Sequence, residues 1–146
     1  MTGVRRGDLF DPTCPTRKLL DRIGTKWTSM AVKVLAESGE LRFTELRRAI
    51  PGVSQKMLSV TLRSLVGDGL VDRRVEHTVP PRVHYRLTPL GMSLEAPLSA
   101  LRAWAELHMD EIDRARATSS TDPVATAADM PAASQRPRLS HQPLNR

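Results

Sequence analysis

The chain has 146 residues, enough to bury one core of ordinary size but not two. Lysine and arginine outnumber aspartate and glutamate by 22 to 16, so the formal net charge is +6; this favours polyanionic partners without separating nucleic acid from an anionic membrane. The single cysteine excludes an intramolecular disulfide framework and a structural zinc site built from cysteines, and it favours a reducing, cytoplasmic setting.

Membrane insertion and export are not indicated by the sequence. No apolar run approaches the roughly 20 residues that a helix needs to cross a bilayer. Arg5, Arg6 and Asp8 are not followed by the apolar core of a signal peptide. We therefore expect a chain without a membrane partner.

Two helices are predicted before residue 40. Residues 1–12 are polar, and we expect them to be flexible. A first helix opens near Pro15, a residue suited to the first helical position, and Gly24 interrupts it. A second helix covers Lys26 to Glu37, and the pair Ser38-Gly39 ends it. The apolar residues of this second helix recur at helical spacing and predict a core stripe: Trp27, Met30, Ala31, Val34 and Leu35.

The next segment has the outline of a helix-turn-helix. A short extended piece at residues 40–43 precedes a third helix, for which Thr44 is the expected N-cap. Pro51-Gly52 breaks this helix, and Ser54 caps a fourth helix that runs to about Asp68. The inward face of the fourth helix is predicted from residues three and four apart: Leu58, Thr61, Leu62 and Leu65. Two helices joined by a tight turn are typical of a DNA-binding motif.

The hydrophobic period then changes from about 3.6 to about 2 residues, which indicates strands. Residues 70–75 form one strand and residues 83–87 another, joined by His77 to Pro81. A hairpin placed directly after the second helix of such a motif is a wing. The predicted fold class is therefore mainly α with a small β-hairpin, a winged helix-turn-helix.

A last helix is predicted after Thr88-Pro89, a good helix start, with Pro97 expected to kink or split it. Its apolar residues alternate at spacings of three and four, which is typical of a seam between helices: Leu98, Leu101, Ala105, His108 and Ile112. We expect this seam to pair with a second copy of the chain in a homodimer. Residues 117–146 are rich in Ser, Thr, Pro, Ala and Gln without periodicity and predict a disordered tail, so the domain is expected at residues 13–114.

Positive charge is concentrated in the middle of the chain. Arg42 to Arg86 holds nine Lys and Arg against four Asp and Glu, whereas Thr88 to Asp113 holds one Arg against five acids. The face of the fourth helix opposite its leucines carries Lys56, Ser59, Val60, Arg63 and, toward its edge, Ser64. The N-terminal part of such a helix contacts base edges, so we expect Gln55, Lys56, Ser59 and Val60 to do so. This pattern favours duplex DNA as the partner, although an ordinary solvated helix face would look similar.

The hairpin supports this interpretation. Arg74 and Glu76 alternate with apolar residues on the first strand, and Arg82, His84 and Arg86 do so on the second. We expect this side of the hairpin to be a basic face directed away from the core, with Arg82 near the tip and able to reach a minor groove. Weaker candidates for phosphate contacts are Arg42, Arg47, Arg48 and Arg73.

Four segments carry a resemblance to a known family: "CP…LLDRIGTKWT", "GELRFTELRRAIPGVSQKMLSVTLRSLVGDGLVDR", "VPPRVHYRLTPLG" and "LRAWAELH". In this order and spacing, from Cys14 to His108, they resemble the HxlR family of winged-helix regulators. The resemblance implies a homodimeric, DNA-binding transcriptional regulator that dimerises through its N-terminal and C-terminal helices. For a two-fold dimer we expect an inverted-repeat operator. The tail lies outside the resemblance.

Cys14 has two interpretations. It is either a small, partly buried packing residue or a redox or electrophile sensor, because a thiolate is favoured near the start of a helix and close to Arg17 and Lys18. The resemblance implies the second, since some members of the family respond to oxidants through a cysteine before a proline at this position. With one cysteine in each chain, a disulfide must join two chains or include a small thiol.

Two other function classes are less favoured. An enzyme is not indicated, because the four histidines have no metal-ligand spacing and no phosphate-binding glycine loop is present; we expect no cofactor and no metal. A winged helix recruited for protein–protein contact would not need basic residues on both the fourth helix and the hairpin. The sequence identifies no small-molecule effector.

Overall fold

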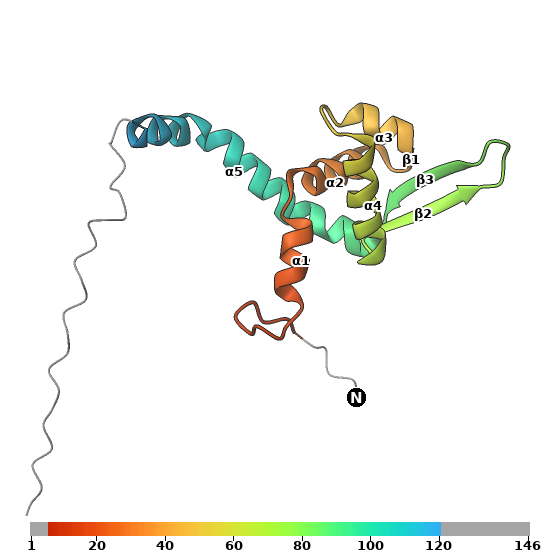
Figure 1. Ribbon diagram of the computed structural model, residues 1–146, viewed down its shortest axis with the longest axis horizontal. Helices are drawn as coiled ribbons and strands as arrows, with labels where there is room; N and C mark the ends of the chain where they lie inside the picture. The colour runs from red at the N-terminus through yellow and green to blue at the C-terminus, as the bar shows by residue number, and fades with distance from the viewer. Residues whose placement is uncertain (1–5, 121–146) are drawn as a thin grey trace, which may run out of the picture. The chain divides into compact units, whose positions relative to one another are not determined.

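The computed structural model describes residues 6–120, and it confirms the predicted fold class, a mainly helical chain with a small antiparallel sheet. The chain forms two compact units, Met1–Leu107 and His108–Arg146. The elements, in order, are α1 (Thr16–Ile23), α2 (Lys26–Ser38), β1 (Leu41–Arg42), α3 (Phe43–Ala49), α4 (Gln55–Gly67), β2 (Val71–Glu76), β3 (Arg82–Leu87) and α5 (Pro89–Ser119). Figure 1 shows α2, α3 and α4 gathered together, with the β2–β3 hairpin extending away from them.

The core is built from the apolar faces of the three central helices. Leu35 of α2, Leu46 of α3 and Leu58 of α4 are fully buried, and Leu62 and Leu65 of α4 are almost so. Burying each such side chain stabilises the fold by roughly 1.5–3 kcal/mol. The predicted inward stripe of α4 is therefore confirmed, and the rest of that helix is directed away from the core.

The sheet has one strand more than the predicted hairpin. Its order is β1-β3-β2, all antiparallel, with Leu41 opposite Tyr85 and Val71 opposite Leu87. The short extended piece expected before the third helix is β1, and it pairs with the outer side of β3. The wing is thus attached at its base to the chain segment that enters α3.

The predicted start of α3 is wrong by two residues. The helix begins at Phe43 and its N-cap is Arg42, not Thr44. The reason is Glu45, whose Oε1 accepts hydrogen bonds from both the backbone N and the Nε of Arg42, at 3.2 and 2.8 Å. A glutamate at the third helical position accepts a hydrogen bond from the backbone amide of the N-cap residue, here Arg42, and so fixes the start of the helix.

α5 is one continuous helix, so the expected split at Pro97 is not found. Proline removes one hydrogen bond from the helix, but Leu94 packs against the core before Pro97 and Leu98 is buried at 7% exposure just after it. The helix also runs to Ser119, past residue 117 where the tail was expected to begin. Residues 1–5 of the expected flexible N-terminus and 121–146 of the expected tail lie outside the described residues.

An ion pair joins α1 to the end of α4. The Arg22 guanidinium donates two hydrogen bonds of 2.7 Å to the carboxylate of Asp68, the residue that caps α4. The hydrogen bond to Asp68 raises the pKa of Arg22. Bidentate arginine–carboxylate pairs fix geometry as well as charge, so the orientation of α1 relative to α4 is specified.

The start of α5 is packed tightly against the turn that follows α4. Thr88 Oγ1 donates to the Gly69 carbonyl at 2.6 Å and accepts from the Gly91 amide at 3.0 Å. Gly91 is buried, and a Cβ added there would lie 1.9 Å from the carbonyl oxygen of Leu70. Only glycine allows this approach of two backbones.

We expect Gly91→Ala to lower the free energy of unfolding by about 1–3 kcal/mol, because the backbone of α5 must shift away from Leu70. The matched control is Gly67→Ala at the end of α4, where a Cβ would meet nothing within 4 Å and should be neutral or stabilising. Urea denaturation at equal protein concentration measures both. Equal stability of the two variants would contradict the close approach.

Candidate nucleic-acid interface

α4 is held so that one long side of it is open to solvent. Ser54 Oγ accepts a hydrogen bond of 3.0 Å from the Met57 amide and caps the helix, as predicted. Because the leucines of α4 fix its inward face, the opposite residues have no core to enter. This exposed side begins at the first turn of the helix, where the amide groups give a partial positive charge.

The residues predicted on α4 lie together on this side. Gln55, Lys56 and Arg63 are exposed, Val60 is 51% exposed, and Ser59 is half-buried. Val60 is a single apolar side chain on this otherwise polar side of the helix. The arrangement offers amide, ammonium, hydroxyl and methyl groups within the first half of one helix.

The wing has two different sides. Strand alternation places Val71, Arg73 and Val75 of β2 on one side of the wing. Tyr85 of β3 lies on the same side, directly opposite Arg73 in the register. Only the base of this side is core, because Val71 is 2% exposed whereas Val75 is 37% exposed. Arg73 is exposed as well and is directed toward α4 rather than into the core.

The opposite side of the wing is mixed in charge and is not the basic face predicted from the sequence. Arg74 donates to the carboxylate of Glu40, and Arg86 pairs with Asp72 at 3.5 Å. The hydrogen bond from Arg74 lowers the pKa of Glu40 and keeps it ionised. The sequence analysis overlooked Glu40, which lies just before β1 and reaches this side only because β1 pairs with β3.

The remaining predicted wing residues differ in their partners. His84 Nε2 lies 3.0 Å from a carboxylate oxygen of Glu76, and this hydrogen bond lowers the pKa of Glu76. Arg82, at the start of β3 next to the tip, is exposed and forms no ion pair within residues 6–120. Arg82 lies opposite Glu76 in the β2–β3 register, so a carboxylate is near it although the two form no salt bridge.

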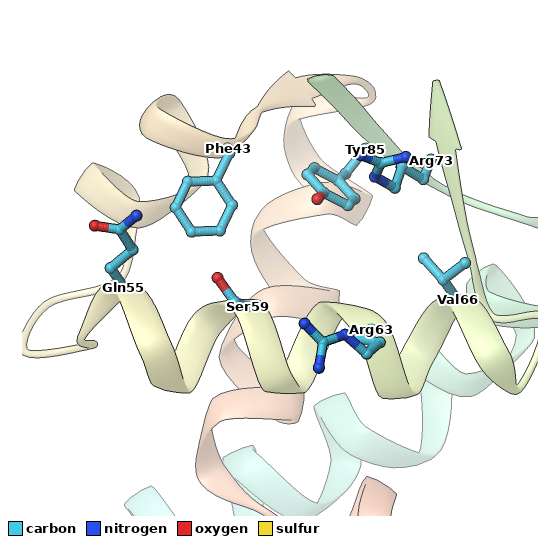
Figure 2. A pocket seen from close by; sticks show the side chains of 7 residues that line it. All are labelled: Phe43, Gln55, Ser59, Arg63, Val66, Arg73 and Tyr85. Atoms are coloured by element: carbon cyan, nitrogen blue, oxygen red, sulfur yellow. The ribbon is translucent and has the colours of Figure 1, made fainter. Parts of the chain in front are cut away.

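A groove lies between α4 and the wing, with a volume of about 450 Å³. It is lined by Phe43, Gln55, Ser59, Arg63, Val66, Arg73 and Tyr85, whose side chains are drawn in Figure 2. The rings of Phe43 and Tyr85 are tilted at 56° with centroids 6.5 Å apart. In the described part of the chain, neither Arg63 nor Arg73 has an acidic partner. Arg73 is a weaker candidate in the sequence, where any solvated arginine looks the same, and its position beside α4 follows from the packing of the wing.

The residues of the predicted dimer seam on α5 differ in how far they are buried. Leu98 is buried within its own chain, Leu101 is 61% exposed, and Ala105 is half-buried. His108 and Ile112, in the second compact unit, are half-buried. The predicted seam does not include other large exposed residues of α5, among them Trp104 at 54% and Leu107 at 79%, which lie three and six residues after Leu101. Their size alone could have indicated them.

Cys14 is 7% exposed and lies just before α1. Its Sγ accepts a hydrogen bond from the Asp8 amide at 3.3 Å and is 3.1 Å from Thr16 Oγ1. Arg17, expected to assist a thiolate, donates instead to the Leu9 carbonyl at 2.8 Å. The cysteine is thus enclosed by the loop that precedes the helix.

Two absences hold for the part of the chain that the structure describes. None of its helices is long and apolar enough to cross a membrane. It contains no group of three or more His, Cys, Asp or Glu placed to hold a metal ion.

Comparison with known proteins supports a helix-turn-helix protein. Residues 22–113 match the family model described as HxlR-like helix-turn-helix. The HTH-type transcriptional regulator YtfH of Escherichia coli (strain K12) is 40% identical over 109 residues, which cover 75% of this chain and 86% of the relative.

Two solved structures are similar to this chain in both fold and sequence. A transcriptional regulator ytfH from Salmonella typhimurium has a TM-score of 0.70 at 38% identity and covers 76% of this chain and 98% of its own. The redox regulator HypR in its oxidised form has a TM-score of 0.56 at 42% identity and covers 64% and 95%. From the family match and these relatives, the chain belongs to the HxlR-like helix-turn-helix family and is a DNA-binding transcriptional regulator.

Proposed function

We propose that the protein binds an inverted-repeat operator as a homodimer, with α4 of each copy in a major groove. The observation that carries this proposal is the exposed side of α4, where Gln55, Lys56, Val60 and Arg63 stand opposite a fully buried leucine stripe. In helix-turn-helix proteins the N-terminal residues of the second helix contact base edges. Residues 13–114 form the DNA-binding and dimerisation domain.

The side chains of α4 match the donors and acceptors of base pairs. Gln55 can pair with adenine through two hydrogen bonds, and Lys56 can donate to O6 or N7 of guanine. The exposed methyl groups of Val60 suit the methyl group of thymine. Ser59 accepts several base edges, and Arg63, further along the helix, reaches a phosphate.

The wing makes backbone and minor-groove contacts. Arg82 carries this role, because it is exposed beside the wing tip and its guanidinium forms no salt bridge within residues 6–120. Arg74 and Arg86 contribute only if DNA phosphates compete with Glu40 and Asp72 for their guanidinium groups. The protein therefore acts by binding and not by catalysis, in the cytoplasm, where chromosomal DNA lies.

Dimerisation covers the apolar side chains of α5. Leu101 would otherwise leave a large apolar surface in water, and Ala105, His108 and Ile112 continue the same predicted seam. Leu98 contributes little new contact, since it is already buried in its own chain. In a two-fold dimer, half-site centres lie about 34–36 Å apart, or a multiple of that distance.

Replacing Lys56 by Ala should change the preferred sequence, with a loss of about 1–3 kcal/mol for the original operator and a smaller loss for random DNA. Selection from a random DNA pool, followed by affinity measurements on the selected and scrambled sites, tests this. Lys33→Ala, an exposed lysine of α2, is the charge-matched control and should keep the original preference. Equal losses on both DNAs for the Lys56 variant would show that Lys56 contacts only the backbone.

Replacing Leu101 by Glu should convert the dimer to a monomer at micromolar concentration, because the change acts twice across a two-fold axis at roughly 1.5–3 kcal/mol each. Ala103→Glu, an exposed position on another side of α5, is the control and should remain dimeric. Sedimentation velocity separates the two species. A dimeric Leu101 variant, or a dissociated Ala103 variant, would place the interface elsewhere.

A second candidate role concerns Cys14 as a redox or electrophile sensor. The observation that favours it is the similarity to a solved structure described as a redox regulator in its oxidised form. The amide hydrogen bond from Asp8 stabilises negative charge on Sγ, while the 7% exposure means that the loop before α1 must open for an oxidant to reach it.

Treatment with diamide should therefore release wild-type protein from its operator and leave the Cys14→Ser variant bound. Serine preserves the size and the hydrogen-bonding capacity of the position, so the variant should fold. Fluorescence anisotropy with labelled operator gives both affinities, and mass spectrometry identifies the modified form. If both proteins respond alike, or if neither responds and native Cys14 resists a thiol probe, Cys14 is a packing residue.

A further inference from the structure

The groove between α4 and the wing has the chemistry of a small-molecule site. We propose that it binds a planar aromatic carboxylate, and that the bound molecule excludes DNA from α4. The exclusion rests on the proposed function, because it requires that α4 is the DNA-contacting helix. The binding itself does not.

Two cationic side chains reach this groove from different elements. Arg63 extends from α4 and Arg73 from β2, and Figure 2 shows both at the same opening. No acidic residue lines the groove, in contrast to the other side of the wing, where Glu40 and Asp72 pair with the neighbouring arginines. Guanidinium groups without an acidic partner are suited to bind a carboxylate through paired hydrogen bonds.

The apolar walls of the groove distinguish an aromatic ligand from a simple anion. Phe43, Val66 and Tyr85 line it together with the arginines, and Tyr85 is the register partner of Arg73 across the β2–β3 pair. An inorganic phosphate would use the charges alone and leave these surfaces in water. A flat ring can lie against the aromatic side chains, and stacked or edge-to-face ring contacts stabilise a complex beyond the apolar area that they bury.

Size and polar groups are consistent with this ligand class. The volume of about 450 Å³ falls in the range of roughly 300–1,000 Å³ that is typical of small-molecule sites. The Gln55 amide and the half-buried Ser59 hydroxyl lie on the α4 wall and can orient substituents of the ring. A bicyclic acid of the size of 2-naphthoate is therefore a suitable probe.

Binding in the groove and DNA recognition use the same residues. Gln55, Ser59 and Arg63 line the groove and belong to the set proposed to contact DNA. A ligand that occupies them competes directly, so no conformational change is needed to weaken the complex. The apparent dissociation constant for operator then rises in proportion to one plus the ratio of ligand concentration to its own dissociation constant.

The NMR signal of one tyrosine ring can report on ligand binding in the groove. Tyr85 is the one tyrosine of the chain, so full-length protein labelled with ¹³C-tyrosine gives one ring spin system, located at the site. Without DNA, 2-naphthoate should shift this signal with saturation below about 1 mM. Two control compounds should bind at least about tenfold more weakly. The isosteric 2-naphthamide lacks the negative charge, and inorganic phosphate lacks the aromatic rings.

Two variants separate the groove from general positive charge. Arg73→Gln should weaken 2-naphthoate binding by about tenfold or more, whereas Arg74→Gln, the next residue on β2 and paired with Glu40 on the other side, should change it less than about twofold. No shift of the Tyr85 signal with 2-naphthoate would overturn the proposal. Equal binding of 2-naphthamide or phosphate would do the same, as would equal effects of the two substitutions.

A second measurement tests exclusion. In anisotropy titrations with a selected operator, 2-naphthoate should release wild-type protein and have little effect on Arg73→Gln at the same ligand concentration. If the Tyr85 signal shifts but operator remains bound, exclusion is wrong and the site stands. If the ligand-free protein selects no operator, the proposed DNA contacts of α4 are wrong, while the Tyr85 titration still decides whether the groove binds the acid.

Discussion

The burial of the leucine stripe of α4 is the interaction on which the rest of the structure depends. Leu58, Leu62 and Leu65 pack with α2 and α3 and fix the rotation of α4 about its own axis. Once this rotation is fixed, the opposite side of the helix must face solvent, whatever its residues are. The exposure of the side chains opposite the leucines is thus a consequence of core packing.

The third strand of the sheet changes the charge balance on one face of the wing. β1 brings Glu40 beside Arg74, and Asp72 lies beside Arg86, so these arginines are balanced within the chain. Arg73, on the side of the wing toward α4, and Arg63, on α4 itself, have no such partners among residues 6–120. The guanidinium of Arg73 therefore lies at the groove between the wing and α4, which it lines together with Arg63.

Several contacts hold the surrounding elements in register with this centre. The Arg22–Asp68 pair joins α1 to the end of α4, and Thr88 with Gly91 joins the start of α5 to the turn after α4. α5 also donates from Arg102 to the backbone and side chain of Ser29 on α2. A change in α1 or in α5 therefore reaches the C-terminal end of α4 through short, specific contacts.

The sequence by itself determined the elements, their order and the inward face of α4, because these follow from periodicity and from local signals such as Ser54, Gly24 and the pair Thr88-Pro89. It also placed Gln55, Lys56 and Val60 on the solvent side. Only the tertiary structure decided that Leu98 is buried, that Arg73 faces α4 and that Glu40 neutralises Arg74. Each of these depends on residues far apart in the chain, and neither periodicity nor propensity carries information about which distant side chain becomes a neighbour.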